Sequence, residues 1–137
     1  MKRLLLLCLL ALPAHGSVFT DDLQRCIVKA IKPLDQSIIN VWMFSAMALH
    51  PDLVPYASVT TEVRDKVCKD MAAIYHRVSE VDCKAEWEAS RKADGQLVMQ
   101  VYFMTVGQMA GQNVFLHPDV LAGQKAFATA MTQKVKT

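Results

Sequence analysis

The spacing of the apolar residues is the feature that most constrains how this chain can fold. From about residue 20 onward, apolar side chains recur every three or four positions, as they do along one face of an α-helix. The sequence contains no sustained alternation of apolar and polar residues and no Asn-Gly hairpin turn, the two main signals of antiparallel strands. It therefore predicts an all-α fold, a single helical bundle of four to five helices with short connections.

The N-terminus has the layout of a secretory signal peptide. Lys2 and Arg3 precede an unbroken run of nine apolar residues, and small residues lie three and one positions before a cut after Gly16. A bilayer span needs about 20 apolar residues, so this run is too short to cross a membrane. We expect residues 1–16 to be cleaved and residues 17–137 to form one exported domain, periplasmic or secreted.

The charge balance of the expected mature domain argues against two classes of partner. The whole chain has 15 basic and 13 acidic residues, and removing Lys2 and Arg3 leaves thirteen of each sign. Nucleic-acid-binding domains normally carry a basic excess, so no nucleic-acid partner is expected. No block of like charge favours capture by a membrane surface, and no second long apolar run predicts a membrane span in the mature chain.

Helix boundaries follow from capping residues, prolines and glycines. We predict five helical segments, of which the fourth is bent at Gly95 and the fifth opens with His-Pro-Asp: 20–33, 34–49, 63–81, 82–109 and 117–136. The first segment begins at Thr20, which together with two aspartates suits a helix N-terminus.

The second predicted helix is apolar almost all round, which is typical of a helix buried on every side. We therefore expect it to form the centre of the core. As an alternative, its methionines and aromatic rings could line a pocket for an apolar ligand. Gly107 and Gly111 form a small-x-x-x-small pair in the fourth helix, which predicts the close approach of another helix.

Three cysteines remain after the expected cleavage: Cys26, Cys68 and Cys83. An oxidising compartment favours one disulfide and one thiol. Cys68 and Cys83 flank a predicted helix connection and lie roughly 15 Å apart along it, which is too far for a bridge. Cys26 is therefore the expected common partner, with either Cys68 or Cys83. None of the spacings matches a zinc site or a Cys-x-x-Cys redox pair.

The tripeptide His-Pro-Asp occurs twice, at 50–52 and at 117–119. Proline and aspartate in it are explained by helix termination and initiation, whereas the two histidines are not. A hydrolytic enzyme using His50 or His117 is therefore one alternative, and it requires a carboxylate or nucleophile within hydrogen-bond reach. The sequence has no metalloprotease motif, haem attachment site or phosphate-binding glycine loop, so no cofactor or metal is predicted.

Two aromatic residues are candidates for contact with a partner. Trp87 lies in an otherwise polar stretch, so it is either an exposed binding residue or an anchor at the edge of the core, and we expect burial. Tyr56 lies in a loop after a proline and is the second candidate. His50 and His117 complete the set of candidate contact residues.

These observations favour an exported binding protein that engages another protein without catalysis, as inhibitors and immunity factors do. A carrier of an apolar ligand and a histidine-dependent hydrolase are the alternatives. A protein binder should expose an apolar patch of several hundred Å², and a carrier should contain an apolar cavity of about 300 Å³ or more. A hydrolase should bring a histidine and a carboxylate together in a cleft.

Overall fold

The computed structural model describes residues 17–133, and these form an all-α fold without a strand. The predicted signal peptide, residues 1–16, lies outside the described residues. The helices are α1 (Val18–Ala30), α2 (Pro33–Met47), α3 (Thr61–Arg77), α4 (Lys84–Asp94), α5 (Leu97–Phe115), α6 (Pro118–Gly123) and α7 (Lys125–Thr132). A 3-10 turn, η1 (Val54–Tyr56), and a π turn, η2 (Val78–Asp82), complete the elements.

The structure confirms the predicted fold class, with more helix breaks than expected. The fourth predicted helix is divided into α4 and α5 at Gly95, whose φ of 61° lies in the left-handed region that glycine tolerates. The last predicted helix is divided into α6 and α7 at Gln124. The first helix begins at Val18 rather than Thr20, with Ser17 at the N-cap position. The hydroxyl of Thr20 donates a hydrogen bond of 2.9 Å to Asp94 and does not cap its own helix.

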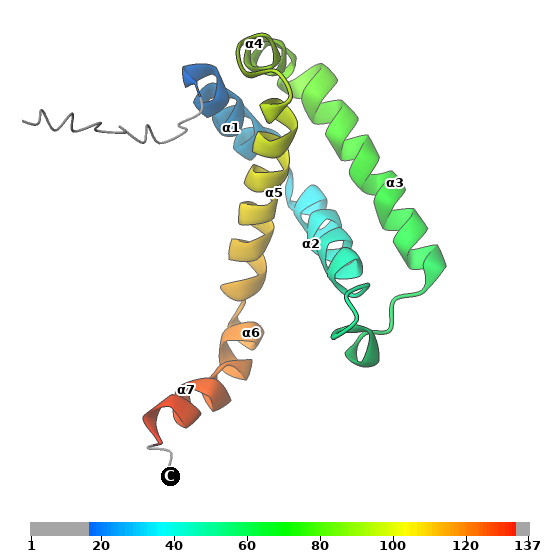
Figure 1. Cartoon of the computed structure of the whole chain (residues 1–137), viewed down its shortest axis with the longest axis vertical. Helices are drawn as coiled ribbons and strands as arrows, with labels where there is room; N and C mark the ends of the chain where they lie inside the picture. The colour runs from blue at the N-terminus through cyan, green and yellow to red at the C-terminus, as the bar shows by residue number, and fades with distance from the viewer. Residues whose placement is uncertain (1–16, 134–137) are drawn as a thin grey trace, which may run out of the picture.

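The body of the molecule is built around α5. This helix packs against α1, α2 and α4, and α3 packs along α2 (Figure 1). Figure 1 also shows α6 and α7 continuing beyond the distal end of α5, away from the other helices. The buried apolar core comprises Leu23, Ile27, Ile39, Met71, Ile74, Val78, Cys83, Trp87, Val98, Tyr102, Val106 and Ala110.

Aromatic rings fill the middle of this core. Tyr102 is fully buried and makes edge-to-face contacts with Tyr75 at 5.2 Å, with Phe103 at 5.4 Å and with Trp87 at 5.8 Å between ring centroids. Such pairs each contribute about 0.5–1.5 kcal/mol beyond the burial of their area. Burial raises the pKa of the Tyr102 hydroxyl to about 12, since the charged form cannot be solvated there, and the neighbouring Tyr75 adds to the effect.

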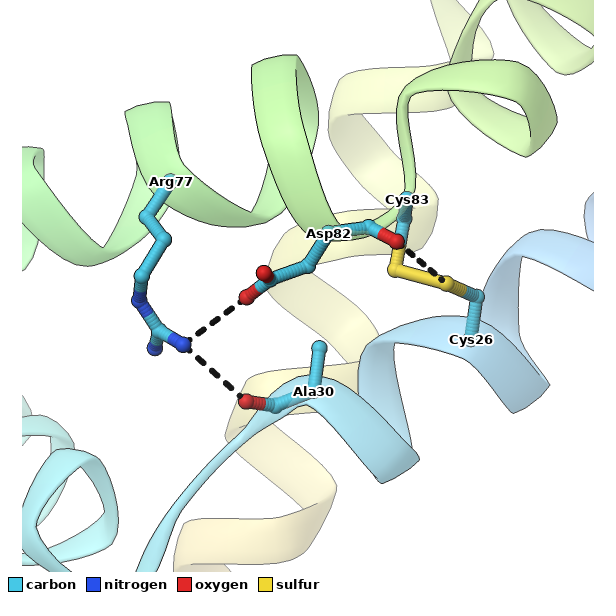
Figure 2. Close-up of a disulfide and its surroundings, with 5 residues drawn as sticks. All are labelled: Cys26, Ala30, Arg77, Asp82 and Cys83. Atoms are coloured by element: carbon cyan, nitrogen blue, oxygen red, sulfur yellow. Dashed lines mark hydrogen bonds and ion pairs between the residues drawn. A yellow bond between two sulfur atoms is a disulfide. The ribbon is translucent and has the colours of Figure 1, made fainter.

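The structure confirms one bridge from Cys26 and decides between its two expected partners. Cys26 is bonded to Cys83, with 5.8 Å between their Cα atoms (Figure 2). Cys68 is a free cysteine exposed on α3. The π turn places Cys83 for this bond, because the Cys83 N–H donates across it to the Val78 carbonyl at 2.8 Å. The same turn interrupts the helical spacing at the end of α3, and Val81 within it is exposed.

Arg77 joins three elements next to the disulfide. Its guanidinium donates to the carbonyl of Ala30 at 3.3 Å, to Asp82 at 2.8 Å and to Asp35 at 2.6 Å (Figure 2 shows the first two). These acceptors lie at the end of α1, in η2 and in the first turn of α2. Asp35 also accepts the backbone N–H of Lys32 at 2.7 Å. Asp35 is buried, Arg77 is half-buried and Asp82 is exposed, so the ion pair with Asp35 is the part of the cluster best shielded from water.

The expectation that the second helix is the centre of the core is wrong. Ile39 and Ser45 of α2 are buried, but Val41, Phe44 and Met47 are about half exposed. Among the described elements, α2 contacts only α3 and α5, which cover two of its sides and leave the third uncovered. An apolar surface remains on this helix that residues 17–133 do not bury.

The expectation of a helix packed closely on Gly107 and Gly111 is also wrong for the described chain. A Cβ atom placed on either glycine would meet no atom within 4 Å apart from its own helix backbone and chain neighbours. Both glycines therefore lie at open positions on α5.

Candidate functional site

An apolar groove between α2 and α5 is the most distinctive surface feature of the described chain. Its volume is about 130 Å³. From α2 it is lined by Asn40, Met43, Phe44 and Met47, and from α5 by Ala110, Gly111, Val114 and Phe115. We call these eight residues the α2–α5 groove. The side chains of Phe44, Met47 and Phe115 are 54, 54 and 61% exposed, so they form an apolar rim that water reaches.

The amino-acid sequence explains why the groove is apolar on both walls. Neither α2 nor α5 has the polar outer face of an ordinary surface helix. Each buries one face, α5 through Tyr102 and Val106 and α2 through Ile39, and each leaves a second apolar face uncovered. The open position at Gly111 removes a side chain from the α5 wall, which leaves room there for another backbone.

The polar groups of the groove are uncharged. Asn40 donates a hydrogen bond of 2.6 Å to the side chain of Asn113, which joins α2 to α5 at the edge of the groove. All eight lining residues are neutral, and Asn40 is the polar one. A surface of this composition suits an apolar side chain or helix face rather than an ion or a charged substrate.

The structure places the predicted contact residues apart from the groove. Trp87 is buried at the edge of the core, as expected, and its ring packs edge-to-face on Tyr75 at 5.4 Å. Tyr56 lies in η1 and is 88% exposed. Neither residue lines the groove.

The two histidines share one local arrangement, which supplies the explanation that the sequence lacked. In each His-Pro-Asp, the ring Nδ1 accepts the backbone N–H of the aspartate two residues later at 3.3 Å. For His117 this bond caps the N-terminus of α6. The carboxylates of Asp52 and Asp119 lie 3.7 Å from the Nδ1 atoms of the preceding histidines, and all four side chains are well exposed. The arrangement has a clear structural role in starting turns and helices.

The larger recesses of the body are open to solvent. One of about 570 Å³ has a mainly apolar lining from Val28, Met109, Leu116 and Pro118, joined by the polar side chains of Gln36, Gln112, Asn113 and His117, and no carboxylate lines it. Another of about 640 Å³ lies beside Trp87, where its lining carries charges of both signs from Glu80, Lys84, Glu88 and Arg91. Within residues 17–133, no group of three or more histidine, cysteine, aspartate or glutamate side chains is arranged to hold a metal ion.

The sequence shows the apolar residues of the groove but does not show that they are exposed. Phe44, Met47 and Phe115 belong to segments more apolar than a one-sided surface helix requires, and for the second helix that excess predicts complete burial. Apolar excess equally fits a face that another chain covers. The pattern alone does not separate the two cases.

Comparison with family models, curated proteins and solved structures found no match to this chain. None of the helices in the described part of the chain is both long and apolar enough to span a membrane.

Proposed function

We propose that this protein is an exported binding module that engages another polypeptide through the α2–α5 groove, without catalysis. The observation that carries the proposal is the exposure of Phe44, Met47 and Phe115 around a groove whose walls are almost entirely apolar. Monomeric proteins rarely leave a large contiguous apolar patch in water, and such patches commonly mark interaction sites.

The exposed area is large enough to matter energetically. An aromatic side chain offers roughly 200 Å², so Phe44 and Phe115 each leave about 100 Å² in water. At about 25 cal/mol per Å², covering each of them would contribute about 2–3 kcal/mol. Residues of this size in the centre of an interface are typical binding hot spots.

The dimensions of the groove favour a polypeptide over a small ligand. Its volume of about 130 Å³ is less than half of the roughly 300 Å³ from which small-molecule sites begin. A helix needs no enclosed cavity, because it can lay one row of side chains into a shallow groove. An enzymatic role for His50 or His117 has less support, since each histidine already accepts a local backbone hydrogen bond.

Export is part of the proposal, and two features support it. The first sixteen residues have the layout of a signal peptide. The disulfide between Cys26 and Cys83 is typical of proteins that fold in an oxidising compartment. A small disulfide-bonded helical domain with an apolar contact face fits the class of inhibitors and immunity factors, whose activity is binding itself.

The experiment is native mass spectrometry of the mature protein purified from the exported fraction of cells that produce it. Three chains are compared: wild type, Phe44→Asp, and Phe19→Asp as the matched control. Phe19 is 46% exposed, close to Phe44, but it lies in the first turn of α1, away from the groove.

We expect a complex heavier than one chain for wild type and Phe19→Asp, and its loss in Phe44→Asp. A single chain in all three samples would contradict the protein-binding function, and a single chain with added small-molecule mass would favour the carrier. A complex that survives Phe44→Asp would show that the partner binds another surface.

A further inference from the structure

The C-terminal segment 118–133, which we call the C-terminal arm, is a second surface that the rest of the described chain leaves uncovered. None of its residues is buried, and Phe127 and Met131 are 67 and 65% exposed. Among the described elements, α7 contacts only α6, and α6 otherwise contacts only α5 (Figure 1). The arm thus projects from the body and gains no stabilisation from the core.

The apolar face of the arm matches what the groove can accept. In α7, Phe127, Ala130 and Met131 lie at i, i+3 and i+4, so they share one face of the helix. The groove offers apolar rims from Phe44 and Phe115 and an open position at Gly111 on its α5 wall. An amphipathic helix that lays such a face into an apolar groove is a common mode of recognition.

We propose that the partner in the groove is a second copy of this chain, and that two copies exchange their C-terminal arms, each α7 lying in the other's α2–α5 groove. This inference rests on the proposed function and names the polypeptide that occupies the site. The exchange is reciprocal, so one two-fold axis covers both unpartnered surfaces of both chains.

The direction of the arm favours the second copy over the same chain. Val114 and Phe115, which line the groove, lie only three or four residues before Pro118, where the arm begins. To enter its own groove, the arm would have to reverse direction at Leu116 and His117. Figure 1 shows it leading away from the body instead. Entry into a neighbouring copy requires no such reversal.

The area and charge of the two surfaces are compatible with a dimer. Seven half-exposed apolar side chains per copy would be covered: Phe44, Met47, Val114, Phe115, Leu121, Phe127 and Met131. At roughly 50–100 Å² each, two copies cover about 1,000 Å² from these side chains alone, which approaches the lower end of about 1,200–2,000 Å² for stable interfaces. The groove is uncharged and the arm carries only Asp119 and Lys125, so like charges do not oppose the contact.

The test is size-exclusion chromatography with multi-angle light scattering on the purified mature protein. Phe127→Asp alters the arm and leaves the groove intact, whereas Phe44→Asp alters the groove and leaves the arm intact. Both side chains are half exposed or more, so circular dichroism should show unchanged helix content. Phe19→Asp is the control for a charge at a similarly exposed phenylalanine.

We expect dimers for wild type and Phe19→Asp and monomers for each of the other variants alone. A mixture of Phe127→Asp with Phe44→Asp should regain a dimer at high protein concentration, weaker than that of wild type, because one intact arm then meets one intact groove and about half of the area is covered. This complementation separates exchange from any other dimer.

A monomeric wild type would overturn the inference, and so would a dimer that survives Phe127→Asp or a mixture that stays monomeric. In those cases the proposed function is judged separately, by whether the exported protein still carries another polypeptide that Phe44→Asp releases. Loss of both results would refute the groove as a binding surface altogether.

Discussion

Reduction of the Cys26–Cys83 disulfide should remove a large share of the stability of the domain. The bond closes a loop that spans 57 residues and ties α1 to the start of α4. In the chain-entropy account, cross-linking a loop of this length destabilises the unfolded state by about 4 kcal/mol at 25 °C. Domains of this size have total stabilities of about 5–15 kcal/mol, so the reduced protein should be markedly less stable.

The assay is urea unfolding of the mature protein, followed by far-ultraviolet circular dichroism, with and without a phosphine reductant. We expect the free energy of unfolding to fall by about 4 kcal/mol on reduction. The control is Cys68→Ser, which should leave the oxidised value unchanged because Cys68 is exposed and outside the bridge. A decrease below about 1 kcal/mol would refute the assignment of Cys26 and Cys83 as the bonded pair or the entropic reasoning behind it.

Three further predictions concern Arg77 and Tyr102. Arg77→Met should lower the free energy of unfolding by about 2 kcal/mol in urea titrations, because it leaves the buried Asp35 without its cation, while Asp82 is exposed and can be solvated; a change within experimental error would contradict the role of this cluster as a junction. Tyr102, whose pKa is raised by burial to about 12, should make the protein less stable as the pH rises from about 10 toward 12, since the unfolded state loses the proton first. Urea midpoints measured across that range should fall more steeply for wild type than for Tyr102→Phe, and equal slopes would count against the shifted pKa. Tyr102→Phe should itself be neutral or slightly stabilising at pH 7, because the buried hydroxyl has no hydrogen-bond partner in the described structure.

The helices were predictable from the sequence because their signals are local. The 3.6-residue period of the apolar side chains, Pro33 at a helix boundary, Pro118 at a helix start and Gly95 at a break act within a few residues of their own position. Pro33 was expected to end the first helix, whereas it is the first residue of α2. The choice of Cys83 over Cys68 was not local. It depends on the π turn that ends α3, and no residue pattern in that stretch announces a π turn.

The exposure of the groove could not be predicted for a different reason. A helix that is apolar all round must be covered on all sides somewhere, but its sequence does not say whether the cover belongs to the same chain. Nothing in the sequence pattern distinguishes the exposed Phe44 and Met47 from a buried apolar residue of the same helix such as Ile39. The placement of α3 and α5 around α2 decides which of them remain in contact with water.

The role of the two histidines could not be predicted from the sequence either. A His-Pro-Asp tripeptide is compatible with catalysis and with capping, and the sequence cannot separate the two. The 3.3 Å contacts from Nδ1 to the following backbone N–H groups supply the structural reason for both copies. Trp87, in contrast, was correctly expected in the core, because its isolated apolar position in a polar helix marks the buried face.

In the functional state of the protein, we expect a polypeptide to cover the α2–α5 groove. Site-specific photo-crosslinking tests this most directly, with benzoylphenylalanine placed at Phe44 in one chain and at Phe19 in another, both in cells that export the protein. We predict a discrete crosslinked polypeptide from position 44, a second copy of the chain if arms are exchanged, and none from position 19. Equal crosslinking from both positions, or none from position 44, would contradict the claim.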